Sequence, residues 1–281
     1  MQTISVAHSP DADDAFMFHG LANGKVATDG LTFTHELVDI ETLNQHAFTE
    51  KYDVTALSFH AYAYLTDRYA LLPCGASFGE DYGPKILTRR PLDRTALSQL
   101  TVAIPGRLTT AALAVQLYLP GVATVCYDFD AIMPAIARGE VDAGVIIHEG
   151  QLTYPDSGLV EHVDLGVWWK ALTGLPLPLG GNGVRRALPD DLQRRIAHCL
   201  RASIDYALTH RMEALDYALS FGRGLAVDSA DTFVGMYVND VTRDYGDRGR
   251  AAVRELLARA HQAGVIPAPV VPTFVTWEGE R

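Results

Sequence analysis

One histidine directly follows a short apolar run, which places an ionisable ring at the end of an expected strand. Residues 141–147 are rich in Val and Ile, and His148 comes next. A run of this kind predicts a buried strand of the parallel type, and open α/β sheets bind ligands at the carboxyl ends of their strands. Imidazole can move protons near neutral pH because its unperturbed pKa is about 6.5. His148 is therefore our candidate catalytic base, with a simple hydrogen bond to a neighbouring loop as the alternative.

Small polar residues follow two further expected strands. Thr109 and Thr110 come shortly after residues 100–104 and open a run typical of a helix. Hydroxyls and free backbone N–H groups at a helix start attract a carboxylate or phosphate, whereas a simple helix cap at Thr109 would contribute about 1 kcal/mol. Ser58 closes the expected strand of residues 53–58 and is either a cap or a ligand donor. These hydroxyls are candidate binding groups for a small anionic or hydroxylated ligand.

Three aspartates, Asp11, Asp13 and Asp14, lie between the first expected strand and an apolar helical stretch. Carboxylates near a helix start stabilise it by roughly 0.3–1 kcal/mol each, so this position alone explains them. Their oxygens are also suited to a hard metal ion, but the full spacing of a calcium loop is absent. The three cysteines are widely separated and lack metal-ligand spacing. We therefore expect no metal site.

Length and charge narrow the classes of function. The chain has 281 residues, enough for two lobes at roughly 150 residues per domain. Its formal net charge of −11 disfavours a general affinity for nucleic acid or an anionic membrane. No apolar run approaches the ~18 residues that span a bilayer, and the first residues lack the pattern of a signal peptide. We expect a soluble, cytoplasmic protein that binds a small molecule, and its oligomeric state stays open.

Strand and helix patterns alternate through the first two thirds of the chain, which is typical of an α/β protein built on parallel sheets. After Pro189 the pattern becomes helical, with apolar residues three and four positions apart. The expected helices of this part are residues 191–210, 211–221, 228–237 and 247–263. The expected strands are residues 3–8, 31–38, 53–58, 84–89, 100–104, 122–127, 141–147, 160–165 and 177–184.

Two segments predict crossings between lobes, because they mix extended apolar residues with flexible ones. They are residues 83–91 and 175–183, both of which contain Gly and Pro. Two crossings imply an inserted lobe of residues 90–176. The remaining residues, 1–89 and 177–281, would form one discontinuous α/β lobe that carries the C-terminal helices.

Several common catalytic motifs are absent from the sequence. We find no Walker A motif, dinucleotide glycine fingerprint, His-Glu-x-x-His or Gly-x-Ser-x-Gly. Nucleotide hydrolysis, hydride transfer and serine esterase chemistry therefore lose support.

A series of short motifs runs along nearly the whole chain. They are Ser9-Pro10 with Asp14 and Phe16, Asp39-Ile40-Glu41-Thr42-Leu43-Asn44, Leu57-Ser58, Asp67-Arg68-Tyr69, Pro105-Gly106-Arg107 with Thr109-Thr110, Ile146-Ile147-His148-Glu149, Thr153-Tyr154-Pro155, Val163-Asp164-Leu165-Gly166 and Thr173-Gly174-Leu175-Pro176-Leu177-Pro178-Leu179-Gly180. Each motif is unspecific alone. In this order they resemble the 1,4-dihydroxy-6-naphthoate synthase family of the futalosine route to menaquinone.

This resemblance implies a periplasmic-binding-protein-like fold of type II, in which two α/β lobes surround a cleft, used as a cytoplasmic enzyme. It implies a carbon–carbon lyase that converts cyclic dehypoxanthinyl futalosine to 1,4-dihydroxy-6-naphthoate and dihydroxyacetone. By the same resemblance, His148 matches the proton acceptor of the family, and Thr109 and Thr110 match its paired substrate-binding residues. A further substrate-contacting segment of the family matches Ala56, Leu57 and Ser58.

The loop after the first strand departs from the pattern of the family. Many relatives read Ser-Pro-Cys-Pro-Asn-Asp-Thr-Phe there, whereas residues 9–16 read Ser-Pro-Asp-Ala-Asp-Asp-Ala-Phe, so an amide and a hydroxyl are lost. The loss of these two polar groups argues against a role of the whole loop in substrate contact. Ser9 is unchanged and stays a candidate substrate-binding residue. Tyr154 is another candidate, because an aromatic side chain near the cleft would cover a flat ring. Its alternative role is to pack under Pro155.

The resulting hypothesis is that neutral His148 removes a proton from a sugar hydroxyl. The alkoxide would then collapse in a retro-aldol sense and break the bond to the ring carbon, and elimination would leave an aromatic diol. This chemistry needs no metal or organic cofactor. The alternatives are a small-carboxylate binding protein of the same fold and chorismate dehydratase, the sister enzyme of the pathway. The effector lobe of a transcription regulator is disfavoured because no helix-turn-helix is appended.

Overall fold

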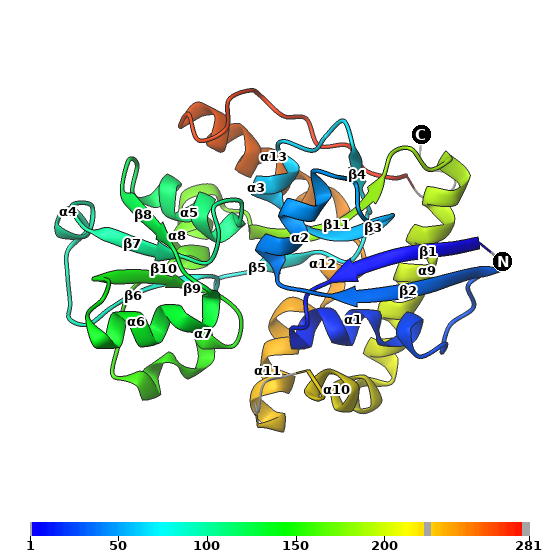
Figure 1. The fold of residues 1–281 in the computed structure, drawn as a ribbon, viewed down its shortest axis with the longest axis horizontal. Coiled ribbons are helices and arrows are strands. Elements are labelled where there is room, and N and C mark those ends of the chain that lie inside the picture. The colour runs from blue at the N-terminus through cyan, green and yellow to red at the C-terminus, as the bar shows by residue number, and fades with distance from the viewer. Residues whose placement is uncertain (1, 222–225, 277–281) are drawn as a thin grey trace.

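Two β-sheets flanked by helices form two lobes, and the chain crosses between them twice (Figure 1). The computed structural model describes residues 2–221 and 226–276. The first sheet has the strand order β2-β1-β3-β11-β4, with β5 paired to β11, and the second has the order β10-β6-β9-β7-β8. The strands of the first sheet are β1 (Gln2–His8), β2 (Leu31–Leu37), β3 (Val54–Ser58), β4 (Tyr69–Leu71), β5 (Ser77–Gly79) and β11 (Leu177–Arg185). The strands of the second sheet are β6 (Lys85–Thr88), β7 (Thr101–Ile104), β8 (Ala123–Cys126), β9 (Ala143–Ile146) and β10 (Val160–Asp164).

The helices bury the apolar faces of both sheets. Helix α1 packs against α9, α10 and α11 beside the first sheet, around a core that includes Phe16, Ile196 and Phe233. Among the described residues, no helix combines the length and the apolar character that crossing a bilayer would require. The α-helices are α1 (Ala12–Ala22), α2 (Ile40–Ala47), α3 (Phe59–Tyr62), α4 (Arg94–Leu97), α5 (Thr110–Tyr118), α6 (Ile132–Arg138), α7 (Gly150–Thr153), α8 (Leu165–Thr173), α9 (Asp190–Thr209), α10 (Arg211–Leu219), α11 (Val227–Tyr237), α12 (Asp240–Arg243) and α13 (Gly246–Gln262). Two 3₁₀ helices are η1 (Phe129–Ala131) and η2 (Tyr154–Ser157).

The α/β class and the arrangement of two lobes are confirmed, but both sheets are mixed rather than parallel. Strand β11 pairs antiparallel with β3, β4 and β5, and β6 pairs antiparallel with β9 and β10. Strands β6 and β11 each enter their sheet directly after a crossing from the other lobe, so each runs in the direction opposite to the βα units of that sheet. Strands β4 and β5 were not predicted, because each has only three residues and shows no period of its own.

The expected boundary of the first lobe is too late in the chain. Residues 84–89 were assigned to that lobe, whereas β6 pairs with β9 and β10 in the second sheet. The last strand of the first sheet before the crossing is β5, so the chain crosses at residues 80–84. The return crossing lies at residues 174–176, directly before β11. The extended pattern near residue 85 therefore marks the strand that follows the crossing.

The first crossing packs closely against the start of α8. A Cβ atom on Gly166 would lie 1.9 Å from the Tyr82 carbonyl oxygen, and one on Gly83 would lie 2.8 Å from the Gly166 nitrogen. Strand β5 also pairs with the first residues of β11, with Gly79 opposite Leu177. The two crossings therefore lie side by side.

Replacing Gly166 by alanine should destabilise the protein, because the new methyl group would overlap the Tyr82 carbonyl. Overpacking of this kind costs about 1–3 kcal/mol. Gly235 in α11 offers a matched control, since a Cβ there would lie 3.4 Å from Arg211 and alanine is favoured over glycine in a helix by up to about 1 kcal/mol. Urea denaturation of both variants tests the contact. Equal free energies of unfolding for Gly166→Ala and Gly235→Ala would contradict it.

Candidate active site

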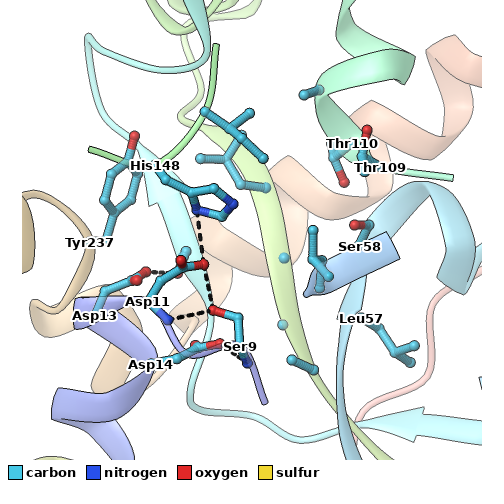
Figure 2. A pocket seen from close by; sticks show the side chains of 18 of the residues that line it. Ser9, Asp11, Asp13, Asp14, Leu57, Ser58, Thr109, Thr110, His148 and Tyr237 are labelled. Atoms are coloured by element: carbon cyan, nitrogen blue, oxygen red, sulfur yellow. Dashed lines mark hydrogen bonds and ion pairs between the residues drawn. The ribbon is translucent and has the colours of Figure 1, made fainter. Parts of the chain in front are cut away.

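A cleft between the two lobes gathers polar side chains from both (Figure 2). It encloses about 770 Å³, counting the part open to solvent. Ile40, Leu179 and Phe233 contribute apolar wall. The polar side chains of the cleft are Ser9, Asp11, Asp13, Asp14, Ser58, Ser77, Thr109, Thr110, His148, Gln151, Asn182 and Tyr237.

Most of the residues singled out in the sequence lie in this cleft, although they come from distant parts of the chain. Ser9 follows β1, residues 56–58 end β3, Thr109 and Thr110 begin α5, and His148 follows β9. The carboxyl ends of these strands point toward the space between the lobes, and this common direction brings the side chains together. The cleft residues expected from the sequence are Ser9, Ala56, Leu57, Ser58, Thr109, Thr110 and His148.

His148 lies in a tight turn between β9 and α7. Its backbone φ is +56°, in the left-handed region that non-glycine residues seldom occupy. Residues held in this region cost of order 1–3 kcal/mol and cluster at functional sites. The ring contacts Phe129 edge-on, with 4.9 Å between centroids, and 17% of the side chain is exposed. The turn thus holds the imidazole at the cleft and keeps part of it open to a ligand.

An aspartate from the opposite lobe pairs with this imidazole. His148 Nδ1 lies 3.0 Å from Asp11 Oδ2, and the Asp11 side chain is only 4% exposed (Figure 2). The Ser9 hydroxyl donates to the same Oδ2 at 2.5 Å and accepts from the Asp11 N–H at 3.1 Å. Nδ1 is therefore committed to Asp11, and Nε2 is the ring nitrogen that can exchange a proton with a ligand.

The imidazole and the carboxylates around it shift one another's pKa values. Burial disfavours the imidazolium, but the charge and hydrogen bond of Asp11, with Glu149 and Asp13, outweigh it and raise the pKa of His148 to about 9. Burial also raises the pKa of Asp14 to about 6, against the hydrogen bond from the Ser9 N–H. Burial and repulsion from Asp14 and Asp11 hold the pKa of Asp13 well above its usual range. At neutral pH His148 is thus mainly the imidazolium, and the neutral base of the hypothesis is a minor form.

The start of α5 forms the facing wall of the cleft (Figure 2). The Thr109 hydroxyl accepts from the Ala112 N–H at 3.2 Å and donates to the Gly106 carbonyl at 2.8 Å, so it caps the helix. The Thr110 oxygen accepts from the His60 N–H at 3.5 Å. Among the described residues, no bond uses the hydrogen of the Thr110 hydroxyl. Thr109 therefore caps the helix, whereas Thr110 has a hydroxyl hydrogen that it can donate to a ligand.

A second set of donors and acceptors lies where β3 and β11 run side by side. The Ser58 N–H donates to Asn44 Oδ1 at 2.9 Å, and Asn44 Nδ2 donates to Ser58 Oγ at 3.1 Å. This pairing fixes the Ser58 oxygen and leaves its O–H for a ligand. Asn182 donates from Nδ2 to the Gly75 carbonyl at 2.7 Å, whereas its Oδ1 is buried and has no partner among the described residues. A ligand hydroxyl would satisfy that oxygen.

Tyr154 is placed outside the cleft. Its hydroxyl donates to Glu161 at 2.8 Å, and its ring packs with the small core of the second lobe. The 3₁₀ helix η2 carries this residue past the turn that holds His148. The aromatic rings that do line the cleft are Phe233 and Tyr237, from a helix that follows the second crossing.

The sequence did not reveal several residues of the cleft. The Tyr237 hydroxyl donates to Gln151 Oε1 at 2.8 Å, and this bond joins α11 of the first lobe to α7 of the second. Asp11 was explained as a helix start, but its side chain makes no capping bond to α1. The one available signal was the acidic cluster after β1, which a helix dipole explained equally well. Among the described residues, no group of three or more His, Cys, Asp or Glu side chains is arranged to hold a metal ion.

The two lobes and their cleft define a protein of the periplasmic-binding-protein-like class. A structure from Candida albicans, described as exhibiting the generic periplasmic binding protein fold, superposes with a TM-score of 0.70 at 12% identity and covers 100% of this chain and 99% of its own. This similarity shows the fold alone.

More similar proteins identify the family. The family model for menaquinone biosynthesis matches residues 4–262. The 1,4-dihydroxy-6-naphthoate synthase of Thermus thermophilus is 42% identical over 275 residues, which cover 98% of this chain and 100% of that protein. A crystal structure of an Archaeoglobus fulgidus protein superposes with a TM-score of 0.90 at 44% identity, covering 94% of this chain and 98% of its own. The chain belongs to the menaquinone biosynthesis family.

Proposed function

We propose that this protein is a 1,4-dihydroxy-6-naphthoate synthase, which converts cyclic dehypoxanthinyl futalosine to 1,4-dihydroxy-6-naphthoate and dihydroxyacetone. The similarity to the Thermus thermophilus enzyme spans both lobes. The observation that carries the proposal is the position of His148, the matched proton acceptor, in one cleft with Thr110 and Ser58. A solute receptor would need donors in this cleft but no base held against a carboxylate.

In the proposed mechanism, the neutral form of His148 acts as general base through Nε2. It removes a proton from a hydroxyl of the sugar-derived part, and the alkoxide electrons form a carbonyl while the bond to the ring carbon breaks. Elimination from the resulting ring carbanion then breaks the bond to the oxygen of the three-carbon fragment, the His148 imidazolium returns its proton to that oxygen, and dihydroxyacetone and the aromatic diol remain. General base catalysis of this kind contributes about 10²–10⁴ in rate. Asp11 stabilises the imidazolium that forms, because the pair lies at 3.0 Å.

The remaining cleft residues would hold the substrate in register. The Thr110 hydroxyl and the first backbone N–H groups of α5 suit an anionic end of the substrate. The Ser58 hydroxyl and Asn182 Oδ1 suit its hydroxyl groups, and Phe233 gives an apolar surface for the flat ring. Positioning of this kind contributes much of the rate of an enzyme that uses one base.

The direct test is to incubate the purified protein with cyclic dehypoxanthinyl futalosine and to follow the naphthoate chromophore and dihydroxyacetone. Both products should form in equal amounts without added cofactor. Tight binding of the substrate without products would favour the receptor alternative. Dehydration of chorismate, with no reaction of the futalosine compound, would favour the sister enzyme.

The two threonines should give different phenotypes when each is replaced by valine. Thr110→Val removes a free donor from the cleft, so KM should rise about tenfold, as expected for one hydrogen bond of about 1.4 kcal/mol, with little change in kcat. Thr109→Val removes the cap, so the free energy of unfolding should fall by about 1 kcal/mol. Steady-state kinetics and urea denaturation of both variants check this. A normal KM in Thr110→Val would remove that hydroxyl from substrate binding.

A further inference from the structure

The loop between β1 and α1 is shaped to hold one carboxylate against the imidazole. The Ser9 hydroxyl makes two hydrogen bonds with Asp11. It donates to Asp11 Oδ2 at 2.5 Å and accepts from the Asp11 N–H at 3.1 Å. The Ser9 N–H also donates to Asp14 at 2.9 Å, which fixes the turn. Asp11 Oδ2 thus has a defined position before it meets His148 Nδ1 at 3.0 Å. A surface ion pair would lack this support, and Asp11 is 4% exposed.

We propose that Asp11 is a positioning residue for His148, which keeps the proton on Nδ1 and so presents Nε2 to the substrate. A neutral imidazole carries its proton on either nitrogen, and a carboxylate that accepts from Nδ1–H selects one tautomer and one ring orientation. This inference rests on the proposed function, because it assigns Asp11 a role in that reaction. Asp11 itself need not touch the substrate.

Three other carboxylates lie near the ring. Glu149 is the next residue along the chain from His148, and Asp13 and Asp14 lie on the first turn of α1. All three are anionic when ionised and add to the attraction for the imidazolium. Asp13 accepts from the Ser77 hydroxyl at 3.3 Å, and Asp14 accepts from Ser9. Asp11 Oδ2 lies 3.0 Å from Nδ1 in a position that the Ser9 hydroxyl fixes, so Asp11 selects the tautomer.

The pair also joins the two lobes. Asp11 belongs to the first lobe and His148 to the second, and the bond from Tyr237 to Gln151 crosses the same cleft. The imidazole is therefore oriented by Asp11 only while the lobes are held in this arrangement. Binding of a substrate that contacts both walls would favour this arrangement and the productive tautomer together.

The experiment compares Asp11→Asn, Asp11→Glu and the control Asp216→Asn, which removes an exposed carboxylate of α10. kcat and KM are measured between pH 6 and 10, and the imidazole of His148 is followed by ¹⁵N NMR, with His148→Gln used to assign its signals. At pH 10, where the ring is mainly neutral in both proteins, kcat of Asp11→Asn should be lower between about 10- and 10⁴-fold, while KM changes less than threefold. The NMR signals should show a lower pKa of His148 and a mixture of tautomers. Asp11→Glu should recover part of kcat and part of the single-tautomer NMR signature. Asp216→Asn should match the wild type.

Two results would overturn the proposal. One is an Asp11→Asn variant that keeps kcat at pH 10 within threefold, and the other is an unchanged tautomer and titration of His148. If Asp11→Asn does not fold, Ser9→Ala provides the same test, because it releases Asp11 Oδ2 from its anchor and should lower kcat in the same direction. If the wild type makes no naphthoate, the proposed function fails, while the NMR comparison still decides whether Asp11 sets the tautomer.

Discussion

Replacing His148 by alanine will leave a folded protein that still binds substrate, while kcat falls by about 10²–10⁴. The loss corresponds to removing a general base from the transition state. KM should change little, because the hydroxyls and the helix start that hold the substrate lie on other residues of the cleft. Steady-state kinetics, together with binding measured by calorimetry, separate the two effects.

The backbone at position 148 calls for a second variant. Its φ of +56° strains alanine, whereas asparagine tolerates the left-handed region well. His148→Asn should therefore lose the same activity with a smaller loss of stability. His198→Ala, on the exposed side of α9, controls for the loss of a histidine outside the cleft. Normal turnover in either His148 variant would remove this residue from the chemistry.

The second large effect concerns pH. The pKa of His148 is raised to about 9, so only roughly 1% of the ring is neutral at pH 7 in the free enzyme. The base must be neutral to accept a proton. Below the pKa, its neutral fraction increases about tenfold for each unit by which the pH rises. We therefore expect kcat/KM to rise about a hundredfold between pH 6 and pH 8 and to level off near pH 9.

A profile of kcat/KM against pH in constant-ionic-strength buffers checks this expectation. A plateau that already begins near pH 6.5 would show an unperturbed imidazole and would contradict the close pairing with Asp11. The Asp216→Asn variant should follow the wild-type profile, because that carboxylate lies on the exposed side of α10. Stability should be followed over the same range, so that unfolding is not mistaken for titration.

Local patterns predict much of this architecture. Apolar runs and helical spacing reflect burial along one element, and so the expected strands and the helices after Pro189 agree with the structure to within a few residues. The carboxyl ends of strands also led to His148, Ser58 and the Thr109–Thr110 pair. What these patterns do not contain is pairing between distant segments. Strands β4 and β5 exist because β11 passes beside them.

The same limit applies to the site. Asp11 and His148 come from different lobes, and no periodicity relates the two positions. The helix-dipole explanation of the acidic loop was sufficient on local grounds, because Asp13 and Asp14 do lie in the first turn of α1. Only the spatial arrangement shows that Asp11 turns away from that helix. Tyr154 shows the opposite error, since a motif beside an active-site turn need not face the active site.

The adjacent crossings carry a further consequence. Strand β5 is hydrogen-bonded to the start of β11 within the first sheet, so the two crossings leave the first lobe side by side and form one narrow connection about which the second lobe could rotate. Such a rotation would move His148 away from Asp11 and would separate Tyr237 from Gln151. An enzyme that admits its substrate in this way has a poorly aligned base while water fills its interior. Proton abstraction would thus be confined to a molecule that both halves already enclose.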